Sequence, residues 1–134
     1  ALVPNGRALL QFVCAGERPS VEQVMTAVTD DPRWSAAFEG FAPPFVHIDP
    51  ATLAATASAA GLTVTDVEIV DREWDFGARA DFAAWCTVGA ADWTARLDPS
   101  QVADFVDATV GRYEAIVGRG LFRFMQLRAE LARA

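Results

Sequence analysis

The sequence predicts an α/β fold in which helices cover a short sheet. Three stretches lead to this prediction: an apolar strand over residues 7–15, a helix over residues 49–60, and a strand over residues 62–75. The helix passes directly into the second strand, as in one half of an α/β unit, and the upstream strand supplies the other half. The chain has 134 residues, of which 52% are hydrophobic and 22% charged, so it is large enough for one domain with its own core.

The first strand follows the turn Pro4-Asn5-Gly6, in which we expect Gly6 to take a positive φ. Residues 7–15 have the sequence RALLQFVCA and end at Gly16. An apolar run bounded by turn residues is typical of a strand that is covered on both faces. The chain begins one turn before this strand and without a methionine. We therefore expect it to be a fragment of a longer domain.

The helix over residues 49–60 has clear signals at both ends. Asp49 is a suitable N-cap, and Pro50 occupies the first helical position, where no N–H is needed. Gly61 provides the left-handed residue that ends the helix. Apolar positions four and three residues apart predict one narrow buried face, formed by Leu53, Ala57 and Ala60.

The strand over residues 62–75 and the tail are less regular. In the strand, the alternation of apolar and polar residues slips near Asp66 and again after Val70, which favours bulges. The tail from Leu121 has residues with good helix propensity, yet its apolar residues alternate with polar ones as in a strand. Periodicity alone leaves the tail open between helix and strand.

Four further helices are predicted. Ser20 and Gln23 form a capping box for the first, and Asp98 and Gln101 form one for the last, which ends before Gly118. A short helix starts at residues 31–32, and another covers residues 80–88. The residues expected to face inward are Val21, Val24, Met25, Val28, Trp34, Ala37, Phe38, Phe82, Trp85, Cys86, Val102, Phe105, Val106, Val110, Tyr113 and Val117.

A stretch over residues 40–47, GFAPPFVH, cannot be helical because two consecutive prolines remove donors and favour extended backbone. Four aromatic residues gather around it: Trp34, Phe38, Phe41 and Phe45. One interpretation is that they pin an irregular loop to the core. The other is that they form the wall of a substrate pocket.

Charge and composition exclude several classes of function. The net charge of −7 and a pI near 4.5 argue against a nucleic-acid surface, which needs a basic stripe. All eleven cationic residues are arginines, for which a GC-rich genome is sufficient explanation. Cys14 and Cys86 lie far apart in the sequence and suggest neither a metal nor a redox pair. The chain has neither a long apolar run nor a signal peptide, so we expect a cytoplasmic protein.

The common catalytic motifs of phosphate-binding loops, dinucleotide sites, zinc proteases and serine hydrolases are absent. His47, the only histidine, is either a local packing residue beside a helix cap or a donor at a pocket rim. Alternating acidic residues over 71–75 are interpreted as one solvated strand face rather than a metal or acid–base site. Arg18 and Arg79 are interpreted as solvated surface residues, with binding of an acidic substrate as the alternative.

At this point the sequence resembles a known family. The turn LVPNGR before an apolar strand looks like the "LkPGGr" turn before the fifth strand of class I S-adenosylmethionine-dependent methyltransferases. Residues 32–64 look like the family's helical excursion and its passage from helix to strand. The segments DFAAW, LDPSQ and LFRF are similar to the trans-aconitate methyltransferase group. Leu62 stands where the family commonly has Phe, and His47 where an aromatic residue is common.

The resemblance implies a partial Rossmann-like methyltransferase fold: the last three strands of the sheet with flanking and inserted helices, over residues 1–134. The glycine-rich cofactor loop and the acidic residue for the ribose would lie upstream of Ala1. The parent enzyme would use S-adenosylmethionine on a small molecule, for which the named group suggests a carboxylic acid, whereas this fragment is expected to be inactive and to leave the cofactor unbound. The candidate substrate-binding residues are Trp34, Phe38, Phe45, His47 and Trp85.

The resemblance also orders the sheet. Strands near residues 7–14 and 62–75 should run parallel, with an antiparallel strand near residues 121–129 between them, and the helices from Asp49 and Asp98 should pack on this sheet. An unpaired first strand should make the fragment a homodimer or a swapped oligomer. The alternative to a methyltransferase is a non-catalytic α/β module that binds a small ligand or dimerises through a sheet edge.

Overall fold

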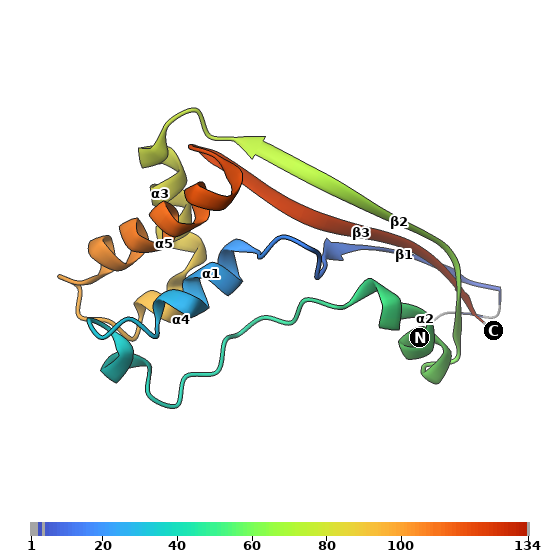
Figure 1. The fold of residues 1–134 in the computed structure, drawn as a ribbon. Coiled ribbons are helices and arrows are strands. Elements are labelled where there is room, and N and C mark those ends of the chain that lie inside the picture. The colour runs from blue at the N-terminus through green and yellow to red at the C-terminus, as the bar shows by residue number, and fades with distance from the viewer. Residues whose placement is uncertain (1–2, 4, 134) are drawn as a thin grey trace. The chain divides into compact units, whose positions relative to one another are not determined.

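The computed structural model describes residues 3 and 5–133 and has the mixed α/β composition that the sequence predicts (Figure 1). The described residues form two compact units. The first, here called the sheet unit, holds the residues up to Arg18, Val46–Arg72 and those from Phe124; the second, the helical unit, holds Pro19–Phe45 and Glu73–Arg123. The elements in chain order are β1 (Arg7–Val13), α1 (Val21–Val28), η1 (Ser35–Phe38), η2 (Pro50–Thr52), α2 (Leu53–Ala59), β2 (Leu62–Asp75), α3 (Arg79–Gly89), α4 (Ala91–Thr94), α5 (Val102–Val117) and β3 (Leu121–Arg133).

The three strands form one sheet in the order β1-β3-β2, so the tail is its central strand. β3 runs antiparallel to β1, with Leu10 opposite Ala129, and the two outer strands point the same way (Figure 1). The predicted order of the strands is therefore confirmed. The alternation in the tail reflects burial, since Leu127, Ala129 and Leu131 all face the core. β3 also extends to Arg133, beyond the predicted end of the strand.

One face of the sheet packs on α2. Its core, here called the sheet core, consists of Cys14, Leu53, Ala57, Leu127, Ala129 and Leu131, with Leu10, Phe12, Leu62, Val64 and Met125 packed against it. Asp49 caps as predicted, because its carboxylate accepts the Ala51 N–H at 2.9 Å, and Gly61 has a φ of 72°. Ala60 is exposed, so its predicted place on the buried face was wrong.

The other face of β1 is open in the described residues. Leu9 is 66% exposed, whereas its neighbours Leu10 and Phe12 pack on the sheet core. The prediction that this strand is covered on both faces is therefore wrong for the described residues. In the preceding turn the positive φ, 61°, belongs to Asn5 rather than to Gly6. Asn tolerates this conformation better than most residues, and Pro4 of the predicted turn lies outside the described residues.

β2 changes face between Val64 and Glu68, where the slip near Asp66 is predicted; the second slip, after Val70, stays a prediction. Val64 packs against the sheet core, whereas Glu68 pairs at 3.3 Å with Arg128, the residue after buried Leu127 on β3. In a regular strand Val64 and Glu68 would share a face. The alternation therefore shifts by one residue between them.

The helical unit is built around α5, whose buried side is formed by Phe105, Val106, Thr109, Val110, Tyr113 and Val117. α5 packs on α1 and α3, and β3 contributes Leu121 and Phe122 to this core. The prediction that the long helix packs on the sheet is thus corrected, because helices occupy most of its apolar side. The capping box of α1 is present, with Ser20 Oγ accepting the Gln23 N–H at 3.2 Å.

The start of α5 differs from its prediction. The Asp98 carboxylate accepts the N–H of Ser100 at 2.9 Å, while the Gln101 side chain accepts the Asp98 N–H at 3.3 Å. Only half of the predicted capping box forms, and the regular helix begins at Val102. The helix predicted from residue 31 is likewise a turn followed by η1. None of the helices in the described residues combines the length and apolar character needed to span a membrane.

Candidate ligand pocket at the end of β1

The pocket lies in the sheet unit, where the chain leaves β1. The Cys14 N–H donates to the Met125 carbonyl of β3 at 2.9 Å, and the Ala15 N–H donates to the Ile48 carbonyl at 3.0 Å. Cys14 and Ile48 form an isolated parallel bridge. These bonds fix the backbone on both sides of the strand end, so the loop that follows starts from a defined position.

Gly16 lets this loop pass close to Met125. A Cβ atom at residue 16 would lie 2.5 Å from the Met125 Cγ, which is far inside van der Waals contact. A larger residue would therefore have to displace the methionine side chain. Because Gly16 has no side chain, the loop can pass close to Met125, and the next residues, Glu17 and Arg18, then lie over the sheet.

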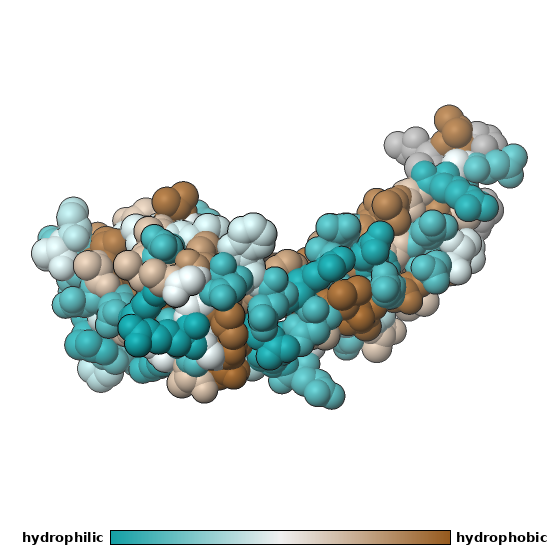
Figure 2. Space-filling model, turned by 90° about the horizontal axis from the view of Figure 1, so that it is seen from above, coloured by the Kyte–Doolittle hydropathy of each residue, from teal (hydrophilic) through white to brown (hydrophobic). Residues whose placement is uncertain are grey.

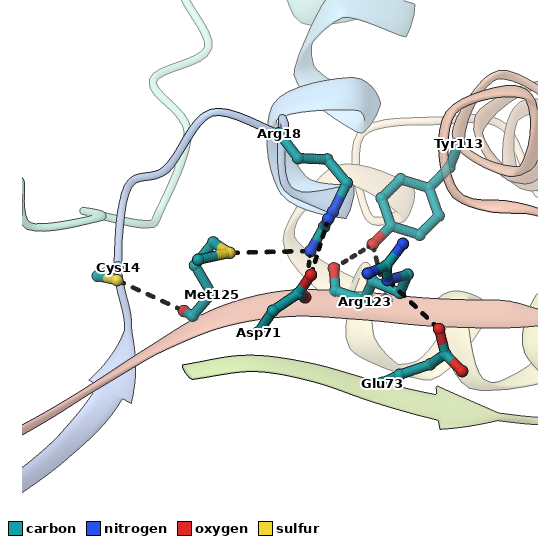
Figure 3. Close-up of polar contacts among 7 residues, drawn as sticks. All are labelled: Cys14, Arg18, Asp71, Glu73, Tyr113, Arg123 and Met125. Carbon is teal, nitrogen blue, oxygen red and sulfur yellow. Dashed lines mark hydrogen bonds and ion pairs between the residues drawn. The ribbon is translucent and has the colours of Figure 1, made fainter. Parts of the chain in front are cut away.

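Arg18 is held over β2 by Asp71 (Figure 3). Its Nη2 donates to Asp71 Oδ1 at 2.6 Å and its Nη1 to Oδ2 at 3.3 Å, in the forked geometry of a strong arginine–carboxylate pair. The Met125 sulfur lies 3.8 Å from the same Nη2. The Arg18 side chain is only 18% exposed. Its interpretation as a solvated surface residue is therefore wrong.

The pocket has a volume of about 480 Å³ and is lined by Ala15, Gly16, Glu17, Arg18, Ile69, Asp71 and Met125. Its apolar lining comes from Ile69, Met125 and Ala15, and its polar lining from one guanidinium and two carboxylates. The volume suits a small molecule with an apolar body. Because Asp71 already neutralises Arg18, the exposed carboxylate of Glu17 leaves the pocket slightly negative.

The thiol that adjoins the pocket, Cys14, is not activated as a nucleophile. Burial raises the pKa of Cys14, so this thiol stays protonated and is a poor nucleophile. Its Sγ donates to the Met125 carbonyl at 3.6 Å. Among residues 3 and 5–133, no group of three or more His, Cys, Asp or Glu residues is placed to hold a metal ion.

Three of the predicted substrate-binding residues, Trp34, Phe38 and Phe45, lie together in the helical unit. Trp34 and Phe38 are buried and contact Phe105 of α5, with ring centroids 5.4 Å apart in both pairs. Phe45 stacks on Trp93 of α4 at 6.2 Å. These contacts favour the interpretation that the aromatic residues pin the proline-containing loop to the core. Their role in substrate binding stays a prediction.

Trp85, the fourth predicted residue, belongs to a different aromatic group on α3. The centroid of its ring lies 4.7 Å from the ring centroid of Phe122 and 5.7 Å from that of Phe76. Trp85 is predicted to face inward; its ring makes these contacts, but 40% of the residue is exposed, so it is not part of the buried core. A cavity of about 160 Å³ is lined by Trp85 together with Val21, Glu22, Met25, Cys86, Gly89 and Trp93. Burial raises the pKa of the Cys86 thiol there to about 12.

His47, the fifth predicted residue, belongs to the sheet unit and precedes Ile48, the residue that bridges to Cys14. It is partly buried. It thus lies beside the segment that holds the end of β1, in a different unit from the four aromatic candidates. Its predicted role as a donor at a pocket rim stays a prediction.

Arg79 and the acidic residues of β2 have structural partners. Arg79 joins α3 to α5 through ion pairs with Asp107, at 2.6 Å, and with Glu114, so it is not a solvated surface residue. Among the acidic residues of β2, Glu73 forms an ion pair with Arg123 at 3.3 Å. The backbone carbonyl of Arg123 accepts a hydrogen bond from the Tyr113 hydroxyl (Figure 3). Asp71 and Glu73 are thus each paired with a separate arginine.

Sequence reasoning missed the part that Gly16, Asp71 and Met125 play in the pocket. The available signal was a glycine directly after a strand, followed by an arginine. Neither a scan against protein-family models nor a search of curated proteins found a match to this chain.

Proposed function

We propose that this chain is the C-terminal, substrate-covering portion of an S-adenosylmethionine-dependent methyltransferase that acts on a small molecule in the cytoplasm. The observation that carries the proposal is the strand order. The resemblance predicts an antiparallel tail strand between two parallel strands, and β3 lies between β1 and β2 in that orientation. Free thiols at Cys14 and Cys86 are compatible with a reducing compartment.

The pocket at the end of β1 gives the proposal a location for the substrate. In open α/β sheets, ligands bind outside the carboxyl ends of parallel strands, and this pocket lies where β1 ends. Its apolar lining would hold the body of the substrate, and the Arg18–Asp71 pair would orient a polar group. A carboxylate substrate would have to compete with Asp71 for the guanidinium. The pocket therefore favours small molecules in general more clearly than carboxylic acids.

S-adenosylmethionine would supply the methyl group from a half of the domain upstream of this chain. The part assigned to this chain is to position the substrate and to exclude water, which are the main requirements of an in-line displacement at carbon. Trp85, the most exposed of the aromatic candidates, lines a separate cavity of the helical unit, and its role in substrate binding stays a prediction.

The proposal is tested with the 134-residue chain and with a form extended upstream in its own gene. Calorimetry should detect no binding of S-adenosylmethionine to the 134-residue chain, and micromolar binding would contradict the division into halves. The extended form should bind the cofactor and transfer a labelled methyl group to small-molecule acceptors. In that form Ile69→Ala, in the pocket, should lower transfer while cofactor binding is kept, and Val67→Ala, on the same strand and outside the pocket lining, is the matched control. An extended form without cofactor binding would refute the proposal.

A second candidate function is a non-catalytic module that dimerises or binds a small ligand. The specific observation that favours it is the open edge of β1, beside an exposed Leu9. Under this proposal the chain is a homodimer or a swapped oligomer. The upstream sequence separates the two candidates, because a strand and a glycine-rich turn within about 100–150 residues would favour the methyltransferase.

A further inference from the structure

We propose that β1 pairs in antiparallel fashion with β1 of a second copy of this chain, about a two-fold axis at Leu10. The inference specifies the geometry of the proposed dimer and does not depend on the methyltransferase function. In the sheet, β3 pairs with one edge of β1, and no strand of the described residues pairs with its other edge.

The hydrogen bonds at the two ends of β1 identify the groups that point away from β3. Gly6 accepts from Arg133 at 3.1 Å, and Cys14 donates to Met125 at 2.9 Å, so even-numbered residues face β3. Since main-chain groups alternate along a strand, those of Arg7, Leu9, Gln11 and Val13 face outward. Among the described residues, the outward main-chain groups of Arg7, Leu9 and Gln11 have no main-chain partner.

The edge of β1 that faces away from β3 is unpaired only as far as Val13. The Ala15 N–H, which also points outward, donates to the Ile48 carbonyl at 3.0 Å. A partner strand therefore cannot continue past this point without displacing the segment that contains Ile48. The free edge is limited to β1 itself, whose middle residue is Leu10.

The chemistry of β1 suits pairing, whereas that of the other edge strand opposes it. Between Arg7 and Glu17 the sequence carries no charged residue. β2, at the other edge, carries six acidic and basic side chains besides its apolar ones: Asp66, Glu68, Asp71, Arg72, Glu73 and Asp75. Charged side chains are a common means of preventing edge pairing, and β1 carries only one, Arg7 at its first position. Figure 2 shows hydrophobic residues gathered in small patches among hydrophilic ones on the face seen there.

A second copy is a self-complementary partner for this strand. With the axis at Leu10, each Leu9 lies opposite Gln11 of the other copy, and each Arg7 lies opposite Val13. The two Arg7 side chains are then at opposite ends of the contact, so no like charges face each other. Leu10 and Phe12 meet their apolar counterparts on the side of the sheet core. Because each copy carries a net charge of −7, added salt should strengthen the dimer.

Sedimentation of the 134-residue chain at micromolar concentrations is the first test. The chain should be a dimer, and Gln11→Pro should weaken it by about 5- to 150-fold, because two hydrogen bonds are lost per dimer. Proline is tolerated on an edge strand where its missing N–H would face solvent, so the monomer should still fold. Gln11→Ala, which keeps the N–H, is the matched control and should dimerise normally. A monomeric parent chain would overturn both this inference and the dimer proposal.

Disulfide trapping tests the register without requiring Gln11→Pro to fold. Leu10→Cys places two thiols at a non-hydrogen-bonded antiparallel pair, where Cα atoms lie about 4.5 Å apart and a disulfide can form. Leu9→Cys is the control, since its counterpart would be Gln11 rather than the same residue. We expect Leu10→Cys to be trapped as a dimer much faster than Leu9→Cys. Equal or reversed trapping rates in a chain that still sediments as a dimer would overturn the register alone.

Discussion

The two units differ in what encloses their buried apolar residues. In the helical unit, Phe82, Phe105 and Tyr113 are fully buried between helices. In the sheet unit, Val67 and Ile69 are 42% and 47% exposed, and one face of the sheet is covered by the seven-residue helix α2. A helix can be surrounded by its neighbours, whereas a three-stranded sheet keeps two edges. In the described residues the helical unit therefore has a core enclosed by helices, whereas the sheet unit keeps free strand edges at β1 and β2, and pairing of the β1 edge with a further strand is the proposal that the tests below address.

The largest expected effect comes from truncating the core of the helical unit. Phe105→Ala removes a ring that contacts both Trp34 and Phe38, and it should lower the free energy of unfolding by about 3–5 kcal/mol. Leu9→Ala in the sheet unit should change it by less than about 0.5 kcal/mol at concentrations where the chain is monomeric. Urea unfolding measures both values. Similar losses for the two variants would remove the contrast between the units.

A smaller effect is expected at the buried hydroxyl of α5. Tyr113 Oη donates to the Arg123 carbonyl at 2.6 Å and lies 3.2 Å from the Arg123 N–H. Tyr113→Phe keeps the ring and removes these bonds, so it should cost about 1–3 kcal/mol. The midpoint of urea unfolding should fall while the slope is unchanged. An unchanged midpoint would show that these two hydrogen bonds do not stabilise the helical unit.

Alkaline pH should weaken the helical unit through Cys86. Burial raises the pKa of this thiol from 9.0 to about 12. Its contribution to stability is full below about pH 9 and is lost as the pH rises toward 12, because only the unfolded chain ionises in that interval. Between about pH 8 and pH 10 the chain should lose about 1 kcal/mol more than Cys86→Ala does. Parallel losses in the two proteins would contradict the burial of the thiol.

The smallest expected effect concerns the pocket in the sheet unit. Arg18→Met removes the two-bond ion pair with Asp71. Because the Asp71 side chain is 37% exposed, the free energy of unfolding should fall by less than about 1 kcal/mol. Asp71→Asn should have a similarly small effect, and the double variant should cost less than the sum of the two single ones. Strict additivity would mean that the ion pair contributes no interaction energy.

The parts of the fold that follow local rules could be predicted from the sequence. The capping box at Ser20 and the glycine at residue 61 were identified correctly, because these devices act within a few residues. The strand character of the tail depended on burial by distant residues, so periodicity alone could not decide it. The start of α5 was misjudged because the Asp98 carboxylate bonds to Ser100 instead of the helix.

The candidate pocket was less predictable than the fold, because it depends on contacts between remote residues. Arg18 meets Asp71, 53 residues along the chain, and nothing in the local sequence of either residue indicates the pair. The aromatic candidates were recognised as a group, and Trp34 and Phe38 do lie together against Phe105. The sequence pattern identified that Trp34 and Phe38 lie together. It could not show that both are buried in the core, which depends on residues far along the chain.

Hydrogen exchange of the main-chain amides tests most directly whether β1 acquires a second neighbour. The amides of Leu9 and Gln11 face outward, and those of Leu10 and Phe12 face β3. As protein concentration rises, protection of the Leu9 and Gln11 amides should increase, while that of the Phe105 amide in the helical unit stays constant. Outward amides that exchange rapidly at every concentration would contradict the account, since β1 would then be a solvated edge.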